Sequence, residues 1–221
     1  NGVYPAPLFD ERVECRLGAD LDSTGTLSAN KIATTIQTLA RFVMLIESMD
    51  VGKCYAIATA AVRRARNGEE FCSLASDVLK QPIQVLSQTE EAKYVARGLT
   101  LNVPSASGLL ADLGGGSIEI VALKKGRIEH HVSFNFGHLS DVDEKDVMSA
   151  FESTDWLSSF EAKRLYGVGG SFRAFGSVFF NQTSYPLPVL HGTKISTDFM
   201  KSLCDDFVGQ ETIFAGVPRS R

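Results

Sequence analysis

The segment Asp112–Ser117, which reads Asp-Leu-Gly-Gly-Gly-Ser, is the feature that most constrains the fold of this chain. It lies between an apolar run at 108–111 and an alternating apolar and polar run at 118–123. Two strand-like runs joined by three glycines predict a hairpin, because glycine tolerates the backbone angles of tight turns. Bare N–H groups with a carboxylate and a hydroxyl beside them are typical of a phosphate loop, although three glycines alone fit a plain turn equally well.

Helical and strand-like patterns alternate before this hairpin. Helices are expected at 28–49, 68–79 and 89–99, and short strands, the first of them buried, at 55–59 and 83–86. This alternation is typical of an α/β fold with a parallel strand pair. From the hairpin onward three successive strands are expected at 109–113, 117–123 and 127–134, and a later strand at 164–168 is followed by a helix from Phe172. A polar stretch at 101–108 marks the boundary between two predicted domains, residues 1–104 and 105–221.

Composition narrows the function classes. The 221 residues are 44% hydrophobic, which is enough for a sizeable core, and the net charge of −4 argues against a nucleic-acid partner. No apolar run approaches the length of a membrane span, so we expect no membrane partner and a cytoplasmic location. The four cysteines form no C-x-x-C pair, which predicts free thiols, and the four histidines lack zinc-ligand spacing.

Two further segments carry the same chemistry as the glycine hairpin. Gly167–Ser171 is a second glycine-rich loop, at a strand-to-helix junction where backbone N–H groups attract anions. Arg63 follows the strand at 55–59, and the carboxyl end of such a strand is where α/β folds bind ligands. The pair Glu90-Glu91 opens a predicted helix, where acidic residues are also favoured simply by the helix dipole.

The order and spacing of four segments resemble the exopolyphosphatase and guanosine pentaphosphate phosphohydrolase family. The segments are Ala58–Arg63, Glu90-Glu91-Ala92, Asp112–Glu119 and Gly167–Arg173. This resemblance implies an actin-like fold of the ATPase superfamily, α/β in class, in which two ribonuclease-H-like domains enclose an active-site cleft. Gln88 stands where the family has glycine, and Ile118 where it has threonine.

The resemblance also implies roles for single residues. Glu91 matches the catalytic glutamate that orients a water, and Arg63 matches an arginine that clamps phosphate. Asp112 and Glu119 match acidic residues of the second phosphate loop, and we expect them to hold Mg²⁺ or Mn²⁺. The phosphate-binding groups are expected in the two glycine loops, at Gly114, Gly115, Gly116, Ser117, Gly169, Gly170 and Ser171.

The implied reaction is hydrolysis of the terminal phosphoanhydride bond of inorganic polyphosphate, of pppGpp, or of both. Two alternatives stay open, namely a non-catalytic sensor of polyphosphate or alarmone and a phosphotransferase or ATPase of the same superfamily. A homodimer is also left open. The family pattern begins with a strand and a first phosphate loop, D-x-G-S-N-S, that has no match from Asn1 onward, and it continues with further structure after Arg221. We therefore expect an N-terminal domain without its first strand, and low activity of these 221 residues by themselves.

Overall fold

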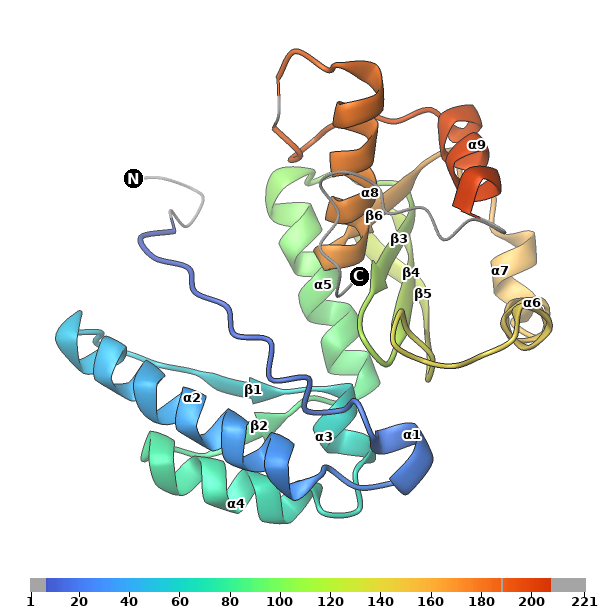
Figure 1. The fold of residues 1–221 in the computed structure, drawn as a ribbon. Helices are drawn as coiled ribbons and strands as arrows, with labels where there is room; N and C mark the ends of the chain where they lie inside the picture. The colour runs from blue at the N-terminus through green and yellow to red at the C-terminus, as the bar shows by residue number, and fades with distance from the viewer. Residues whose placement is uncertain (1–6, 188, 208–221) are drawn as a thin grey trace.

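Two separate sheets organise the fold of the chain, of which the computed structural model describes residues 7–187 and 189–207 (Figure 1). The smaller sheet pairs β1 (Ala56–Ala58) with β2 (Ile83–Val85) in parallel. The larger sheet has the strand order β5-β4-β3-β6. Its strands are β3 (Gly108–Leu113), β4 (Ile118–Lys124), β5 (Arg127–Phe134) and β6 (Leu165–Val168).

Helices cover one side of the smaller sheet. They are α2 (Ala29–Ser48) and α4 (Gly68–Leu79), with the short helices α1 (Leu21–Thr24) and α3 (Ala60–Arg64) at one end (Figure 1). The core between them is formed by Leu27, Val62, Phe71 and Ala75. The predicted buried strand at 55–59 is wrong in its burial, because Ile57 in the middle of β1 is 50% exposed. Among the described residues, helices pack against one face of this sheet, which leaves such side chains in contact with solvent.

The larger sheet has its own core, to which helix α5 (Gln88–Asn102) contributes. In Figure 1 α5 rises from the smaller sheet and runs beside the larger one. Its buried face consists of Ala92 and Ala96, and these small side chains let the helix pack closely on the sheet, chiefly on strands β4 and β5. The core residues from the strands are Leu110, Val121 and Leu123.

The remaining helices follow the hairpin strands. They are α6 (Glu144–Glu152), α7 (Asp155–Ser159), α8 (Gly169–Thr183) and α9 (Thr197–Phe207). The predicted strands of the hairpin region and the predicted helix at 68–79 are confirmed. Helix α8 begins at Gly169, three residues before the predicted start at Phe172.

The division into domains 1–104 and 105–221 stays a prediction, as does the missing first strand. Residues 1–6 and 208–221 lie outside the described residues. Within the described part of the chain, no helix combines the length and apolar character needed to cross a membrane. The four cysteines are free thiols, as predicted.

Candidate active site

Two carboxylates lie side by side where the strands of the larger sheet end. Asp112, near the end of β3, pairs directly with Glu119 on the neighbouring antiparallel strand β4. Residues that face each other across an antiparallel pair have side chains on the same face of the sheet. Asp112 also pairs with Val168, the last residue of the parallel strand β6. The carboxyl ends of β3 and β6 therefore meet at one edge, which is where sheets of this class bind ligands.

The predicted glycine loop forms a tight turn between β3 and β4. The N–H group of Gly114 donates to the carbonyl of Ser117 at 2.9 Å. The carbonyls of Gly114 and Gly115 accept hydrogen bonds from the backbone N–H groups of His138 and Leu139 at 3.1 and 2.9 Å. The N–H groups of Gly115 and Gly116 donate to no other group of the described residues. These two free donors give the loop the capacity to bind an anion.

The second glycine loop forms the first turn of α8 and lies against the first. Gly169 has a left-handed backbone angle, φ +81°, and a Cβ at this position would overlap Asp112 Oδ1. Only glycine allows the carboxylate of Asp112 to lie so close to the start of the helix. The Ser171 hydroxyl is buried and donates to the carbonyl of Leu113 at 2.9 Å. This bond ties the first turn of α8 to the end of β3.

The two glutamates at the start of α5 have different partners. Glu90 forms a capping box with Ser87, in which the Ser87 hydroxyl accepts from the Glu90 N–H and the Glu90 carboxylate accepts from the Ser87 N–H. Glu91 pairs with Arg63, whose Nη1 lies 3.0 Å from Glu91 Oε2. The same Nη1 donates to the carbonyl of Leu86 at 2.6 Å. One glutamate thus caps the helix, and the other is held by the arginine.

Burial and mutual repulsion perturb the carboxylates at this edge. Burial raises the pKa of Asp112, the negative charge of Glu91 raises it further, and the positive charge of Arg173 opposes both effects. Burial also raises the pKa of Glu119, against the hydrogen bonds that this carboxylate receives from Ser117 and Ser133. The charge of Glu91 acts on both groups, so the three carboxylates share one electrostatic environment.

The structure brings the predicted site residues together from four elements, namely α3, α5, the β3–β4 hairpin and α8. The hydroxyls of Ser117 and Ser171 are buried and bonded within the protein, so the groups that these loops offer to an anion are backbone N–H groups. Arg63 Nη2 is buried and has no partner among the described residues. An unpaired guanidinium nitrogen of this kind retains a donor for a phosphate oxygen or a water.

Sequence reasoning missed three residues of the site. Arg173 lies one turn after Gly169, and its positive charge partly offsets the raised pKa of Asp112. Its helical spacing from the glycine loop could have indicated this role. Arg64 Nη1 donates to the carbonyl of Gly116 at 3.3 Å, and its Nη2 binds Asp22 at 2.5 Å. His138 contacts the glycine loop from a segment that carries no local signal for this role.

The raised pKa of Asp112 gives a testable pH dependence of stability. A carboxyl whose pKa is higher in the folded than in the unfolded protein stabilises the fold when protonated, and this contribution is lost as the pH rises above about 3.8 through the raised pKa. Asp112→Asn removes that loss. We therefore expect the variant to have a higher free energy of unfolding than the wild type at pH 7.

Urea unfolding at pH 4 and pH 7 measures this difference. The gain should shrink as the pH is lowered from 7 to 4, because protonation of Asp112 in the wild type removes its unfavourable buried charge. Asp77→Asn, which changes an exposed carboxylate of α4, is the matched control and should show no such pH-dependent gain. Equal stability of Asp112→Asn and the wild type at pH 7 would contradict the assigned environment of Asp112.

The acidic residues fit a magnesium ion better than a transition metal. No cluster of three or more His, Cys, Asp or Glu side chains within residues 7–187 and 189–207 could enclose a metal. Magnesium does not need such a cage, because it keeps several waters and is commonly held by one or two carboxylates and substrate phosphates. Asp112 is only partly buried, whereas Glu119 is 3% exposed and bonded to Ser133 at 3.0 Å. This donor set suits a hydrated ion bound through Asp112, with Glu119 behind it.

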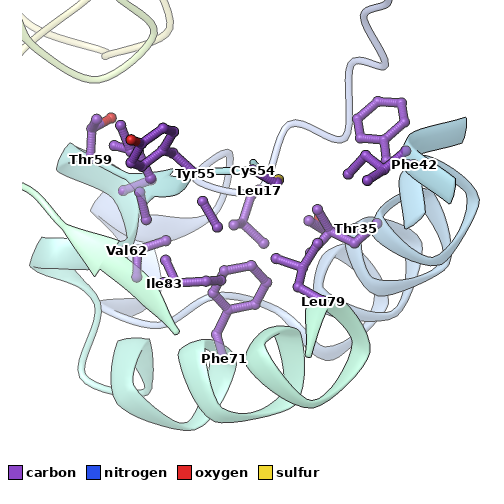
Figure 2. Close-up of a pocket in the computed structure, with 16 residues that line it drawn as sticks. Leu17, Thr35, Phe42, Cys54, Tyr55, Thr59, Val62, Phe71, Leu79 and Ile83 are labelled. Atoms are coloured by element: carbon purple, nitrogen blue, oxygen red, sulfur yellow. The ribbon is translucent and has the colours of Figure 1, made fainter. Parts of the chain in front are cut away.

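An apolar groove is lined by none of the candidate site residues. The groove has a volume of about 450 Å³. Figure 2 shows side chains that line it, with Phe42, Tyr55 and Phe71 among them. None of the lining residues is charged, and neither the glycine loops nor Glu91 belong to them. The groove therefore lacks the cationic side chains and glycine-loop N–H groups expected at a phosphate site and is not part of the candidate site.

Comparisons with known proteins identify the family to which the chain belongs. The sequence model of the Ppx/GppA phosphatase family matches residues 1–213. The chain belongs to this family. Among solved structures, the Aquifex aeolicus member of the Ppx/GppA family is 27% identical, with a TM-score of 0.66 over 87% of this chain and 67% of that one. An exopolyphosphatase from Cytophaga hutchinsonii is 20% identical, with a TM-score of 0.69 over 83% of this chain and 66% of that one.

The family assignment confirms the resemblance found in the sequence and the actin-like α/β fold class. A Ppx/GppA phosphatase hydrolyses phosphate compounds, so this family supports a phosphatase-type hydrolase as the general chemistry. The residues at the carboxyl ends of β3 and β6 are the part of the fold that offers donors and carboxylates for that chemistry.

Proposed function

We propose that the protein releases the terminal phosphoryl group of inorganic polyphosphate, or of pppGpp, by hydrolysis of a phosphoanhydride bond. The observation that carries this proposal is Glu91, which Arg63 fixes at 3.0 Å in a site where two glycine loops present backbone N–H groups. A fixed carboxylate beside an anion-binding loop suits attack by water on a phosphoryl group. The family and the likeness to an exopolyphosphatase support a substrate of this class.

In this mechanism Glu91 orients the attacking water and accepts its proton. Arg63 keeps the Glu91 carboxylate in place, while its Nη2 is free to donate to a phosphoryl oxygen. The N–H groups of Gly115 and Gly116 bind the oxygens on which charge develops during transfer. A magnesium ion bound at Asp112 would supply further charge neutralisation.

One parallel assay tests the proposal. Phosphate release is measured from long-chain polyphosphate, pppGpp and ATP, each with and without Mg²⁺. Release from polyphosphate or pppGpp at a higher kcat/KM than from ATP is the expected result. Binding of these substrates without release would favour a sensor, and a preference for ATP would favour an ATPase or phosphotransferase.

A metal requirement follows from the donor set. We expect no activity in excess chelator and recovery with Mg²⁺ or Mn²⁺, because these hard cations prefer carboxylate oxygens beside phosphate. Asp112→Asn should raise the Mg²⁺ concentration needed for half-maximal activity by about tenfold or more, the usual effect of losing one charged ligand or its support. A magnesium titration of both proteins measures the shift. Full activity of the wild type in chelator would exclude the metal role.

A further inference from the structure

The segment Gly137–Leu139, which follows β5, lies against the glycine loop and contacts the carbonyl groups of that loop. The backbone N–H groups of His138 and Leu139 donate to the carbonyls of Gly114 and Gly115. The imidazole Nδ1 of His138 makes a third bond, at 2.8 Å, to the carbonyl of Gly114. Gly137 lets the two segments approach this closely, because a Cβ there would overlap the carbonyl oxygen of Gly114.

These bonds determine where the N–H groups of the glycine loop point. In a trans peptide the carbonyl of one residue and the N–H of the next point in opposite directions. A fixed carbonyl at Gly114 therefore fixes the N–H of Gly115, and a fixed carbonyl at Gly115 fixes the N–H of Gly116. These are the two N–H groups without a partner among the described residues. The segment that follows β5 thus directs the free donors of the loop away from itself.

The hydrogen bonds also define the proton on the His138 ring. A carbonyl accepts only from a donor, so Nδ1 of His138 carries a hydrogen when it binds Gly114. Ser171 lies 3.4 Å from the same nitrogen and gives its own proton to the carbonyl of Leu113. The ring consequently lies between the two glycine loops and contacts a residue of each.

We propose that His138 is a positioning residue for phosphate binding, which holds the Gly114 peptide so that the free N–H groups of the loop face the substrate. The identity of that substrate rests on the proposed function, whereas the effect on anion affinity does not. The side chain acts through the loop and does not take part in the chemical step. Its loss should therefore raise KM and the Kd for a phosphate chain more than it lowers kcat.

Three substitutions separate this role from simple packing. His138→Ala removes both ring and donor, and His138→Phe keeps the ring volume but removes the donor. His138→Asn retains an N–H donor close to the position of Nδ1. We expect tripolyphosphate to bind His138→Ala and His138→Phe about 3- to 10-fold more weakly than the wild type, the usual effect of one hydrogen bond. His138→Asn should bind within about threefold of the wild type, in keeping with the same magnitude.

Isothermal titration calorimetry with tripolyphosphate gives the affinities, and steady-state kinetics with polyphosphate gives KM and kcat. His130→Ala is the matched control, because His130 stacks on Trp156 at 5.2 Å and makes no side-chain hydrogen bond to Gly137–Leu139 or to the glycine loop within the described residues. Equal affinity of the wild type and His138→Phe would overturn the proposal, as would a wild type that does not bind tripolyphosphate.

Two further outcomes keep the proposals apart. A wild type that binds tripolyphosphate but releases no phosphate would contradict the proposed function and leave the role of His138 intact. If His138→Ala does not fold, Ser140→Ala provides the second test. Ser140 Oγ accepts a hydrogen bond from the Gly137 N–H at 3.0 Å and so helps to hold Gly137–Leu139 in place without contacting the glycine loop itself. That variant should weaken tripolyphosphate binding by about threefold, as expected for one outer hydrogen bond, and unchanged affinity would count against the proposal.

Discussion

Glu91→Gln is expected to lower kcat by about 10²–10⁴-fold, the usual effect of losing a general base, with a much smaller change in KM. Glutamine preserves the length of the side chain and can still accept a hydrogen bond from Arg63 Nη1, which lies 3.0 Å from the carboxylate. It cannot accept a proton from water. Steady-state phosphate release from polyphosphate measures both constants.

The neighbouring glutamate provides a close control. Glu90→Gln alters the capping box of the same helix turn, so it should lower the free energy of unfolding by an amount typical of a weakened cap. Because Glu90 has no role in the proposed reaction, kcat should stay within about threefold of the wild type. Wild-type turnover of Glu91→Gln would remove the catalytic role. The residue would then be a stabilising acidic residue at a helix start, the alternative that the sequence leaves open.

Gly169→Ala is expected to have the second large effect. The added Cβ would overlap Asp112 Oδ1, and the φ angle of +81° disfavours any side chain. The strain should lower the free energy of unfolding by about 1–3 kcal/mol. Because Asp112 must move, activity should fall by about 10²-fold, the cost of a displacement of about 1 Å in a catalytic group. Chemical denaturation and phosphate release measure the two effects.

A second glycine distinguishes strain from displacement. Gly192 has a similar angle, φ +76°, but a Cβ there would meet nothing within 4 Å. Gly192→Ala should therefore carry the conformational cost without the loss of activity. If Gly169→Ala keeps full activity at reduced stability, the position of Asp112 is not important for the reaction.

The sequence predicted the elements that carry the site better than it predicted their surroundings. The hairpin around Asp112–Ser117 and the bounds of α4 follow from local alternation, turn glycines and helical spacing, which act over a few residues. The different roles of Glu90 and Glu91 could also have been predicted from the sequence, because Ser87 followed three residues later by a glutamate is a capping-box pattern.

Other properties depend on contacts between distant segments. The partner of Arg63 lies 28 residues away, and His138 lies 24 residues from Gly114, so no local pattern predicts either contact. The exposure of Ile57 has the same origin, because burial of a strand depends on what packs against it and not on its own apolar residues. The substrate class likewise came from family resemblance, since glycine loops accept any phosphate.

The packing of α5 has a mechanical consequence for the reaction. Ala92, which follows Glu91 directly, is 2% exposed and belongs to the core of the larger sheet. The first turn of α5 carries the candidate base, Glu91, and the same helix is held in place by its packing on the hydrophobic core. The separation of Glu91 from Asp112 is set by how tightly two alanines, Ala92 and Ala96, pack on the larger sheet at β4 and β5. The position of Glu91 relative to the phosphoryl group is thus sensitive to the side-chain volume of core residues that do not contact the substrate, because protein interiors are close-packed.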